Sequence, residues 1–196
     1  MSVVSNFFLE IDRGWRHNVG RIELRLIGAG ALLLQTDYQR GTKDSDVLET
    51  EELTADIKSA LLALAGKNTR IHQRLRMYVE FVASGLPFLP QSPLFHPEAD
   101  LNAQLTHFDV RALDVVDVVV SKLKRFNAND VDDIAAMIDR GVVEHGALVR
   151  RFTNAFDSYV TEADNLATYA RNLNRVERDY LGVAPSVFEP PEFLDR

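Results

Sequence analysis

Apolar and polar residues alternate along residues 21–28, which is typical of a strand with one buried face. Three further short stretches, residues 43–48, 76–83 and 106–113, are also predicted to be strands. Elsewhere apolar residues recur every three or four positions, which is typical of amphipathic helices. These helices are predicted in residues 1–20, 31–37, 50–66, 114–124, 127–141 and 145–181, the last as one long helix or two shorter ones. The mixture of elements predicts an α+β fold.

Turn-forming residues separate several of these elements. The turn Gly28-Ala29-Gly30 lies between the first strand and the helix that follows it, and Gly66 ends the helix at 50–66. Asn127 and Asp130 have the spacing of a capping box, which predicts a helix start there. Prolines recur through residues 85–97 and predict a segment without regular structure.

Two aspartates, Asp44 and Asp46, stand two positions apart on the second predicted strand. Residues two apart on a strand point to the same side, so we expect the two carboxylates to be neighbours. Neighbouring carboxylates repel unless a cation lies between them, and hard oxygen ligands favour Mg²⁺. The pair therefore indicates a metal-dependent phosphoryl or nucleotidyl transfer site; the alternative is an aspartate-rich turn without a ligand.

Two other features fit the same chemistry. Glu80 is the one charged residue in the apolar stretch 77–83, and such a carboxylate either faces solvent or takes part in chemistry. Backbone N–H groups at a helix start, such as the one after Gly28-Ala29-Gly30, bind phosphate with the help of the helix dipole. Three carboxylates can hold two magnesium ions in a site that transfers a phosphoryl group.

The composition limits the classes of function. The 196 residues include no cysteine, which excludes disulfides and thiolate metal sites, and the net charge of −7 argues against broad electrostatic binding to nucleic acid. A basic cluster between Lys67 and Arg76 predicts either an exposed loop or a local patch for RNA. We expect a cytoplasmic protein that does not enter the membrane, because no signal segment and no run of about 18 apolar residues is visible.

The pattern Arg40-x-Thr42-x-Asp44-x-Asp46 resembles a signature of the nucleotidyltransferases related to DNA polymerase beta. The similarity is greatest to a bacterial branch that includes the toxins of abortive-infection toxin–antitoxin systems. A second segment, Asp117-Val-Val-Val-Ser-Lys122-Leu123 followed by Asp130-x-x-Asp133, is also similar to that branch. The resemblance implies a minimal nucleotidyltransferase fold in residues 1–140, a small mixed β-sheet flanked by helices. A helical extension and tail would follow in residues 141–196.

The resemblance also implies a metal site and a general base. Asp44 and Asp46 would be the ligands of Mg²⁺. Glu80 would be the third carboxylate, also a metal ligand, that activates the acceptor. Lys122 would contact the phosphates of the nucleotide.

The remaining implied roles concern the donor nucleotide, a nucleoside triphosphate. The turn Gly28-Ala29-Gly30 would bind its triphosphate, with Ala29 standing where the family usually has Gly or Ser. Arg40 and Thr42 would brace the metal-binding strand or touch phosphate. Glu80 is a second departure, since aspartate is commoner at that position.

The implied activity is the Mg²⁺-dependent transfer of a nucleoside monophosphate to an acceptor, with release of pyrophosphate. The acceptor would be a tRNA 3′ end, a protein hydroxyl or a small molecule such as an aminoglycoside, and a toxin would imply an antitoxin protein as partner. The departures at Ala29 and Glu80 leave an alternative, a catalytically inactive module on the same fold that binds nucleotide or a partner protein. A purely helical interaction protein would account for residues 145–181 but not for Arg40–Val47.

Overall fold

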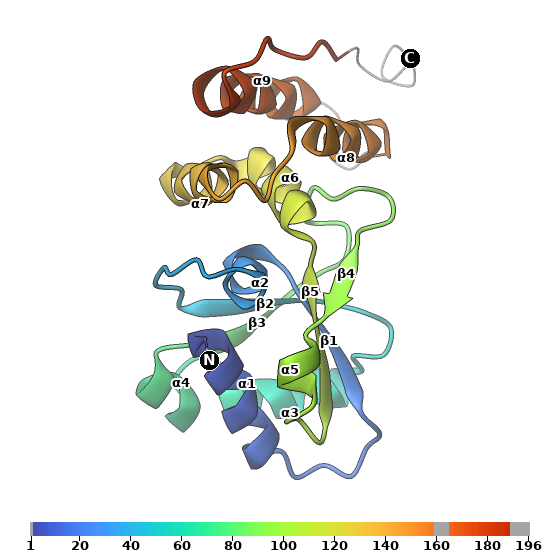
Figure 1. The fold of residues 1–196 in the computed structure, drawn as a ribbon. Coiled ribbons are helices and arrows are strands. Elements are labelled where there is room, and N and C mark those ends of the chain that lie inside the picture. The colour runs from blue at the N-terminus through green and yellow to red at the C-terminus, as the bar shows by residue number, and fades with distance from the viewer. Residues whose placement is uncertain (1, 159–164, 189–196) are drawn as a thin grey trace. The chain divides into compact units, whose positions relative to one another are not determined.

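The computed structural model describes residues 2–158 and 165–188, and Figure 1 traces their elements. The chain divides into two compact units. The first comprises Met1–Leu86 and Phe95–Asp114, and the second comprises Pro87–Leu94 and Val115–Arg196. None of the helices in the described part of the chain combines the length and the apolar character needed to cross a membrane.

The first unit is built on a five-stranded sheet with the order β3-β2-β1-β5-β4. Its strands are β1 (Ile22–Leu26), β2 (Asp44–Leu48), β3 (Tyr78–Val82), β4 (Phe95–Pro97) and β5 (Phe108–Leu113). The pairs β1–β5 and β2–β3 are parallel, whereas β1–β2 and β4–β5 are antiparallel. The sheet is therefore mixed, and the predicted α+β fold and all four predicted strands are confirmed.

The two faces of this sheet differ in chemistry. Along β1, Ile22, Leu24 and Leu26 are buried, while Glu23 and Arg25 between them are partly exposed. The same alternation along β5 gives a second row of buried residues, because paired residues of neighbouring strands share a face. One face thus forms the core of the unit, and the other carries charged side chains.

Five helices accompany the sheet in the first unit (Figure 1): α1 (Val3–Gly14), α2 (Gly28–Gln35), α3 (Ala55–Ala65), α4 (Arg70–Leu75) and α5 (Ala99–Asn102). Ser2 caps α1 by accepting the backbone N–H of Ser5, and the helix buries Phe7 and Phe8 completely. Near its end, Asp12 accepts the backbone N–H groups of residues 106 and 107, which ties the helix to the segment before β5.

Two helices begin at residues that differ from the prediction. α2 begins at Gly28, inside the predicted turn, rather than at Ala31. α3 begins at Ala55 rather than near Thr50, because the Thr54 hydroxyl accepts the backbone N–H of Ile57 and so caps the helix.

Two segments predicted to be irregular contain regular elements. Part of the basic cluster between Lys67 and Arg76 forms α4, which Thr69 caps, whereas Lys67 lies in the turn before this helix. The proline-rich segment 85–97 ends in β4, which the prediction excluded. β4 is the edge strand of the sheet, and an edge tolerates Pro97 because only one side of the strand is paired.

The second unit is helical. It contains α6 (Val115–Arg125), α7 (Ala128–Asp139), α8 (His145–Ser158), α9 (Leu166–Val176) and a π-helical turn, η2 (Glu177–Leu181). The capping box of Asn127 and Asp130 is present at the start of α7 as predicted, and the described parts of residues 145–181 contain α8, α9 and η2.

Residues 87–94 contact the rest of the second unit through the ring of Phe88 and through hydrogen bonds of the backbone. Phe88 is fully buried, and its ring lies 5.5 Å from that of Phe152 and 5.0 Å from that of Tyr169. Asp117, in the first turn of α6, accepts a bidentate pair of hydrogen bonds from Arg151 and the backbone N–H of Leu94. These contacts fasten the proline-rich segment to α6 and α8.

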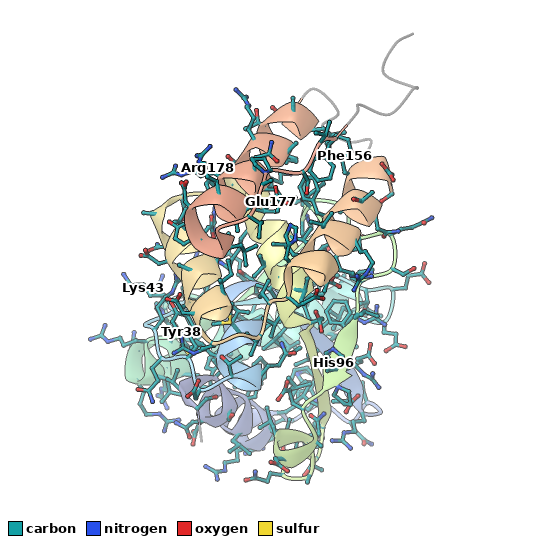
Figure 2. The ribbon with its side chains drawn as sticks, turned by 45° about the horizontal axis from the view of Figure 1, so that its top comes forward. Tyr38, Lys43, His96, Phe156, Glu177 and Arg178 are labelled. Atoms are coloured by element: carbon teal, nitrogen blue, oxygen red, sulfur yellow. The ribbon has the colours of Figure 1, made fainter. Side chains whose placement is uncertain are left out.

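The segment after η2 folds back onto the same unit. The fully buried carboxylate of Glu177 accepts the backbone N–H of Ser186 at 2.8 Å and lies 2.9 Å from His145 Nε2. Burial alone would raise the pKa of Glu177, but the hydrogen bonds from Ser186 and His145 outweigh it and hold this pKa below its ordinary value. Figure 2 labels Glu177 and the neighbouring Arg178, whose side chain is exposed. The part of the predicted tail beyond residue 188 lies outside the described residues.

A buried ion cluster joins α6 to α7. The Lys122 ammonium lies 3.0 Å from Asp130 Oδ1 and 2.7 Å from Asp133 Oδ2, and all three side chains are nearly or fully buried. Arg125 donates two more hydrogen bonds to Asp130. Burial would raise the pKa of Asp130, but the hydrogen bond from Arg125 and the charge of Lys122 lower it overall.

Removing this carboxylate charge should destabilise the second unit. We expect Asp130→Asn to lower the free energy of unfolding by about 1.5–3 kcal/mol at pH 7, since the buried Lys122 ammonium keeps Asp133 but loses its second charged partner. Because the pKa of Asp130 is lowered in the folded state, its contribution is present above the ordinary aspartate pKa of about 3.9 and is lost as the pH falls through the lowered value. Urea unfolding at pH 7 and pH 3 measures both effects.

The matched control is Asp132→Asn, an exposed aspartate on the same helix. Its free energy of unfolding should change by less than about 0.5 kcal/mol. Equal losses in the two variants, or a difference that widens toward acid pH, would contradict the structural role of Asp130.

Candidate active site

Asp44 and Asp46 share one face of β2. Ser45 between them is fully buried on the core side, whereas both aspartates are partly exposed. The strand geometry therefore places the two carboxylates side by side on the charged face of the sheet, as the spacing predicts.

Glu80 lies on the same face, on the neighbouring strand. In the parallel register of β2 and β3, Asp46 pairs with Glu80 and Asp44 pairs with Tyr78. Neighbouring strands are about 4.8 Å apart, so the backbone brings the third predicted carboxylate next to the aspartate pair. The side chains themselves do not converge: within residues 2–158 and 165–188, no three carboxylate or imidazole groups are arranged to hold a metal ion.

The glycine turn touches the aspartate pair directly. Gly28 has φ +64°, a left-handed conformation that favours glycine, and a Cβ at this position would lie 2.9 Å from Asp46 Oδ2. The backbone N–H of Ile27 also donates to the Asp46 carbonyl at 3.0 Å. Ile27, as N-cap of α2, gives the helix no side-chain cap. The first N–H groups of the helix therefore lie beside a carboxylate that could share a phosphate-bound cation.

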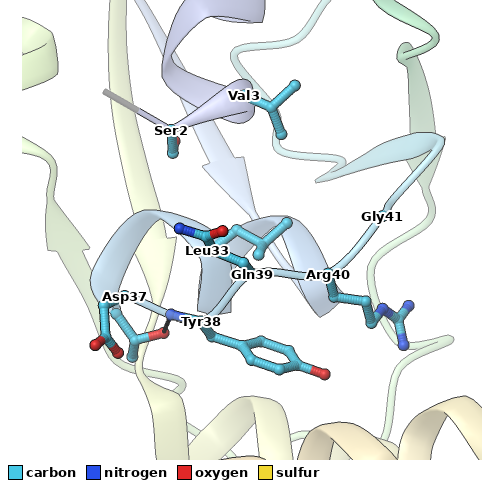
Figure 3. A pocket seen from close by; sticks show the side chains of 9 residues that line it. Ser2, Val3, Leu33, Asp37, Tyr38, Gln39, Arg40 and Gly41 are labelled. Atoms are coloured by element: carbon cyan, nitrogen blue, oxygen red, sulfur yellow. Dashed lines mark hydrogen bonds between the residues drawn. The ribbon is translucent and has the colours of Figure 1, made fainter.

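Thr42 and Arg40 occupy different surroundings. The Thr42 hydroxyl lies 3.1 Å from both the backbone carbonyl and Oδ1 of Asp44, so it braces the first aspartate. Arg40 lines a cavity of about 630 Å³ together with Tyr38 and Leu33 (Figure 3). The cavity also includes Ser2 and Val3 at the start of α1. Thr42 thus contacts the first aspartate and Arg40 lines the cavity, and the predicted roles of both residues in the site stay predictions.

Lys67 contacts Glu80, which the sequence did not indicate. Its ammonium lies 3.4 Å from Glu80 Oε2 and 4.7 Å from the centre of the Tyr78 ring. Hydrogen bonds to Tyr78 and Glu80, followed by the charge of Glu80, raise the pKa of Lys67 above its ordinary value. In the sequence, only the place of Lys67 in the basic cluster marked this residue. That Glu80 is its partner follows only from the fold.

A row of alternating charges extends the same face across β1 and β5. Glu23 accepts from Arg25 at 2.7 Å and lies 2.8 Å from Arg111, which also pairs with Asp109. Arg25 and Arg111 are register partners, so Glu23 compensates two cations held side by side. The patterns Glu23-x-Arg25 and Asp109-x-Arg111 are the sequence signals that could have marked these residues.

The match to known families agrees with this geometry. A family model described as "Nucleotidyltransferase of unknown function (DUF6036)" matches residues 8–181. The chain belongs to this family. The match extends over most of both compact units. No curated protein and no solved structure gives a significant match.

The side-chain oxygens on this face of the nucleotidyltransferase are suitable ligands for a hard divalent cation. Asp44, Asp46 and Glu80 offer carboxylate oxygens, the ligands that Mg²⁺ prefers, and the chain has no cysteine to favour a softer metal. Lys122 lies in the second unit, where Asp130 and Asp133 neutralise its ammonium. Its predicted contact with nucleotide phosphate stays a prediction.

Two glycine-to-alanine variants should differ in their free energy of unfolding, because Gly28 has a left-handed conformation and Gly30 does not. Gly28→Ala should lower the free energy of unfolding by about 1–2 kcal/mol, because alanine would adopt a left-handed conformation, and its Cβ would press on Asp46. Gly30→Ala should be neutral or stabilise by up to about 1 kcal/mol, because its Cβ would meet no atom closer than 3.9 Å and alanine favours the helix. Chemical denaturation of both variants provides the measurement, and a larger loss for Gly30→Ala would contradict the assigned geometry.

Proposed function

We propose that this nucleotidyltransferase moves a nucleoside monophosphate from a nucleoside triphosphate to an acceptor in a Mg²⁺-dependent reaction. One observation carries the proposal: Gly28, at the start of α2, lies against the carboxylate of Asp46. A helix start binds phosphate and a carboxylate pair binds Mg²⁺, so one location offers both functions.

The residues of β2 and α2 would hold the donor. Asp44 and Asp46 would bind Mg²⁺, with Thr42 fixing the orientation of Asp44. The metal, when bound, supplies positive charge that stabilises the negative charge developing on the phosphate oxygens. The N–H groups of residues 28–30 would bind the triphosphate and fix its direction relative to the carboxylates.

Glu80 would be the third carboxylate of the metal site and would also act as the general base. It would accept the proton of the acceptor hydroxyl while that oxygen forms a bond to the α-phosphorus. The bond between the α-phosphorus and the bridging oxygen breaks, and pyrophosphate leaves. Glu80 suits this role because its side chain is 46% exposed on the same sheet face as Asp46, where an acceptor from solvent can reach it.

The acceptor classes follow the resemblance of Arg40–Val47 to the bacterial branch. We include a tRNA 3′ end, a protein hydroxyl and a small molecule such as an aminoglycoside in the proposal. A toxin role with an antitoxin protein as partner depends on that resemblance alone.

One contact favours a second candidate function, an inactive nucleotide-binding module on the same fold. Glu80 is paired with Lys67, and the three carboxylates do not converge in the described part of the chain. Such a module would bind a nucleoside triphosphate with Mg²⁺ but would release no pyrophosphate with any acceptor.

Thermal unfolding with each nucleoside triphosphate tests the donor site. With Mg²⁺ and a nucleotide at about 100 times its dissociation constant, the protein should gain roughly 2.7 kcal/mol. For a chain of this size the gain corresponds to a rise in Tm of roughly 5–11 °C. EDTA and the variant Asp46→Asn should each abolish the rise, because both remove the cation that neutralises the triphosphate.

The matched control is Asp109→Asn, which removes a carboxylate from the same sheet face on β5. It should keep the rise in Tm. A rise that persists in Asp46→Asn, or that is lost in both variants, would overturn the assignment of the donor site. Pyrophosphate release with the three acceptor classes then separates the enzyme from the inactive module.

A further inference from the structure

We infer that Lys67 is a positioning residue that holds Glu80 apart from the aspartate pair and must release it before Glu80 can join a metal site. The inference rests on the proposed function, since it concerns the same three carboxylates. Asp46 and Glu80 are register partners, so their backbones are adjacent, yet the Glu80 carboxylate is bound to the Lys67 ammonium.

The position of Lys67 is fixed by its surroundings. Asn68 adopts a left-handed φ of 68° and donates its N–H to His72 Nδ1 at 2.9 Å, which shapes the turn between α3 and α4. The His72 ring packs edge-on against the Tyr78 ring at 5.1 Å, and the Lys67 ammonium lies over that same ring. The turn at Asn68, the Tyr78 ring and the Glu80 carboxylate therefore define one position for the Lys67 ammonium.

The ion pair between Lys67 and Glu80 is expected to be weak, so that another cation can replace Lys67. The Lys67 side chain is 59% exposed and that of Glu80 46% exposed, and exposed pairs contribute little because solvent screens them. An ammonium and a divalent cation compete for the same carboxylate, and the divalent cation carries twice the charge. Lys67 should thus weaken metal binding without preventing it.

Metal binding in the absence of nucleotide tests the competition. We would titrate the full chain with Mn²⁺ alone and follow free Mn²⁺ by electron paramagnetic resonance. Lys67→Met keeps an unbranched side chain over Tyr78 but removes the charge, and it should bind Mn²⁺ roughly twofold to fivefold more tightly. Lys67→Arg keeps the charge and should bind as the wild type does.

Two controls isolate the contact with Glu80. Arg74→Met also removes one positive charge from this region, but Arg74 pairs with Glu10 and should leave Mn²⁺ affinity unchanged. In a Glu80→Gln background, Lys67→Met should no longer tighten binding, because the carboxylate for which the two cations compete is gone.

The outcomes separate this inference from the proposed function. If Asp46→Asn abolishes Mn²⁺ binding but Lys67→Met binds as the wild type does, the role of Lys67 is overturned and the metal site stands. If Lys67→Met and Arg74→Met tighten binding equally, the effect is general electrostatics and the role of Lys67 is again overturned. If wild type and Asp46→Asn bind Mn²⁺ equally, or neither binds it, the metal site itself fails and the inference fails with it.

Discussion

Like charges placed side by side on one face of a sheet are the constraint on which the first unit depends. The register of β2 and β3 sets Asp44, Asp46 and Glu80 on adjacent positions, where carboxylates repel one another. The opposite face offsets this cost, because Leu24, Leu26 and other apolar residues of the sheet are completely buried against the helices. The core thus holds together an arrangement that the charges alone would oppose, and it leaves that arrangement available for a cation.

The same constraint explains the contacts around the carboxylates. Several acidic side chains of this face lie close to a polar or positively charged group: Thr42 beside Asp44, Lys67 beside Glu80, and two arginines beside Glu23. Gly28 approaches Asp46 without a side chain, so the helix start and the carboxylate come closer than any other residue would allow. Of these contacts, those of Lys67 and Gly28 bear most directly on the proposed binding of a metal and a triphosphate.

Local patterns in the sequence were sufficient for the strands and for the Asp44–Asp46 pair, because alternation and spacing act within one element. They were also sufficient for the capping box at Asn127. They failed where two local signals competed, as at Thr50 and Thr54, and where an element depends on its neighbour, as β4 depends on β5. The pairing of Asp46 with Glu80 and the hold of Lys67 on Glu80 could not be predicted, since register and loop geometry arise only in the assembled sheet.

Burial distinguishes the charged residues that serve structure from those available for chemistry. In the second unit, Lys122 and Asp117 are nearly or fully buried and each is matched by opposite charge, an arrangement that is costly to disturb. In the first unit, Asp44, Asp46 and Glu80 remain partly exposed on a sheet face, where a ligand can replace the present partners at little cost. The proposed function therefore assigns the chemistry to the sheet of the first unit. The spacing that made Lys122 resemble a phosphate-binding lysine is also compatible with a lysine that links two helices, and its contact with phosphate stays a prediction.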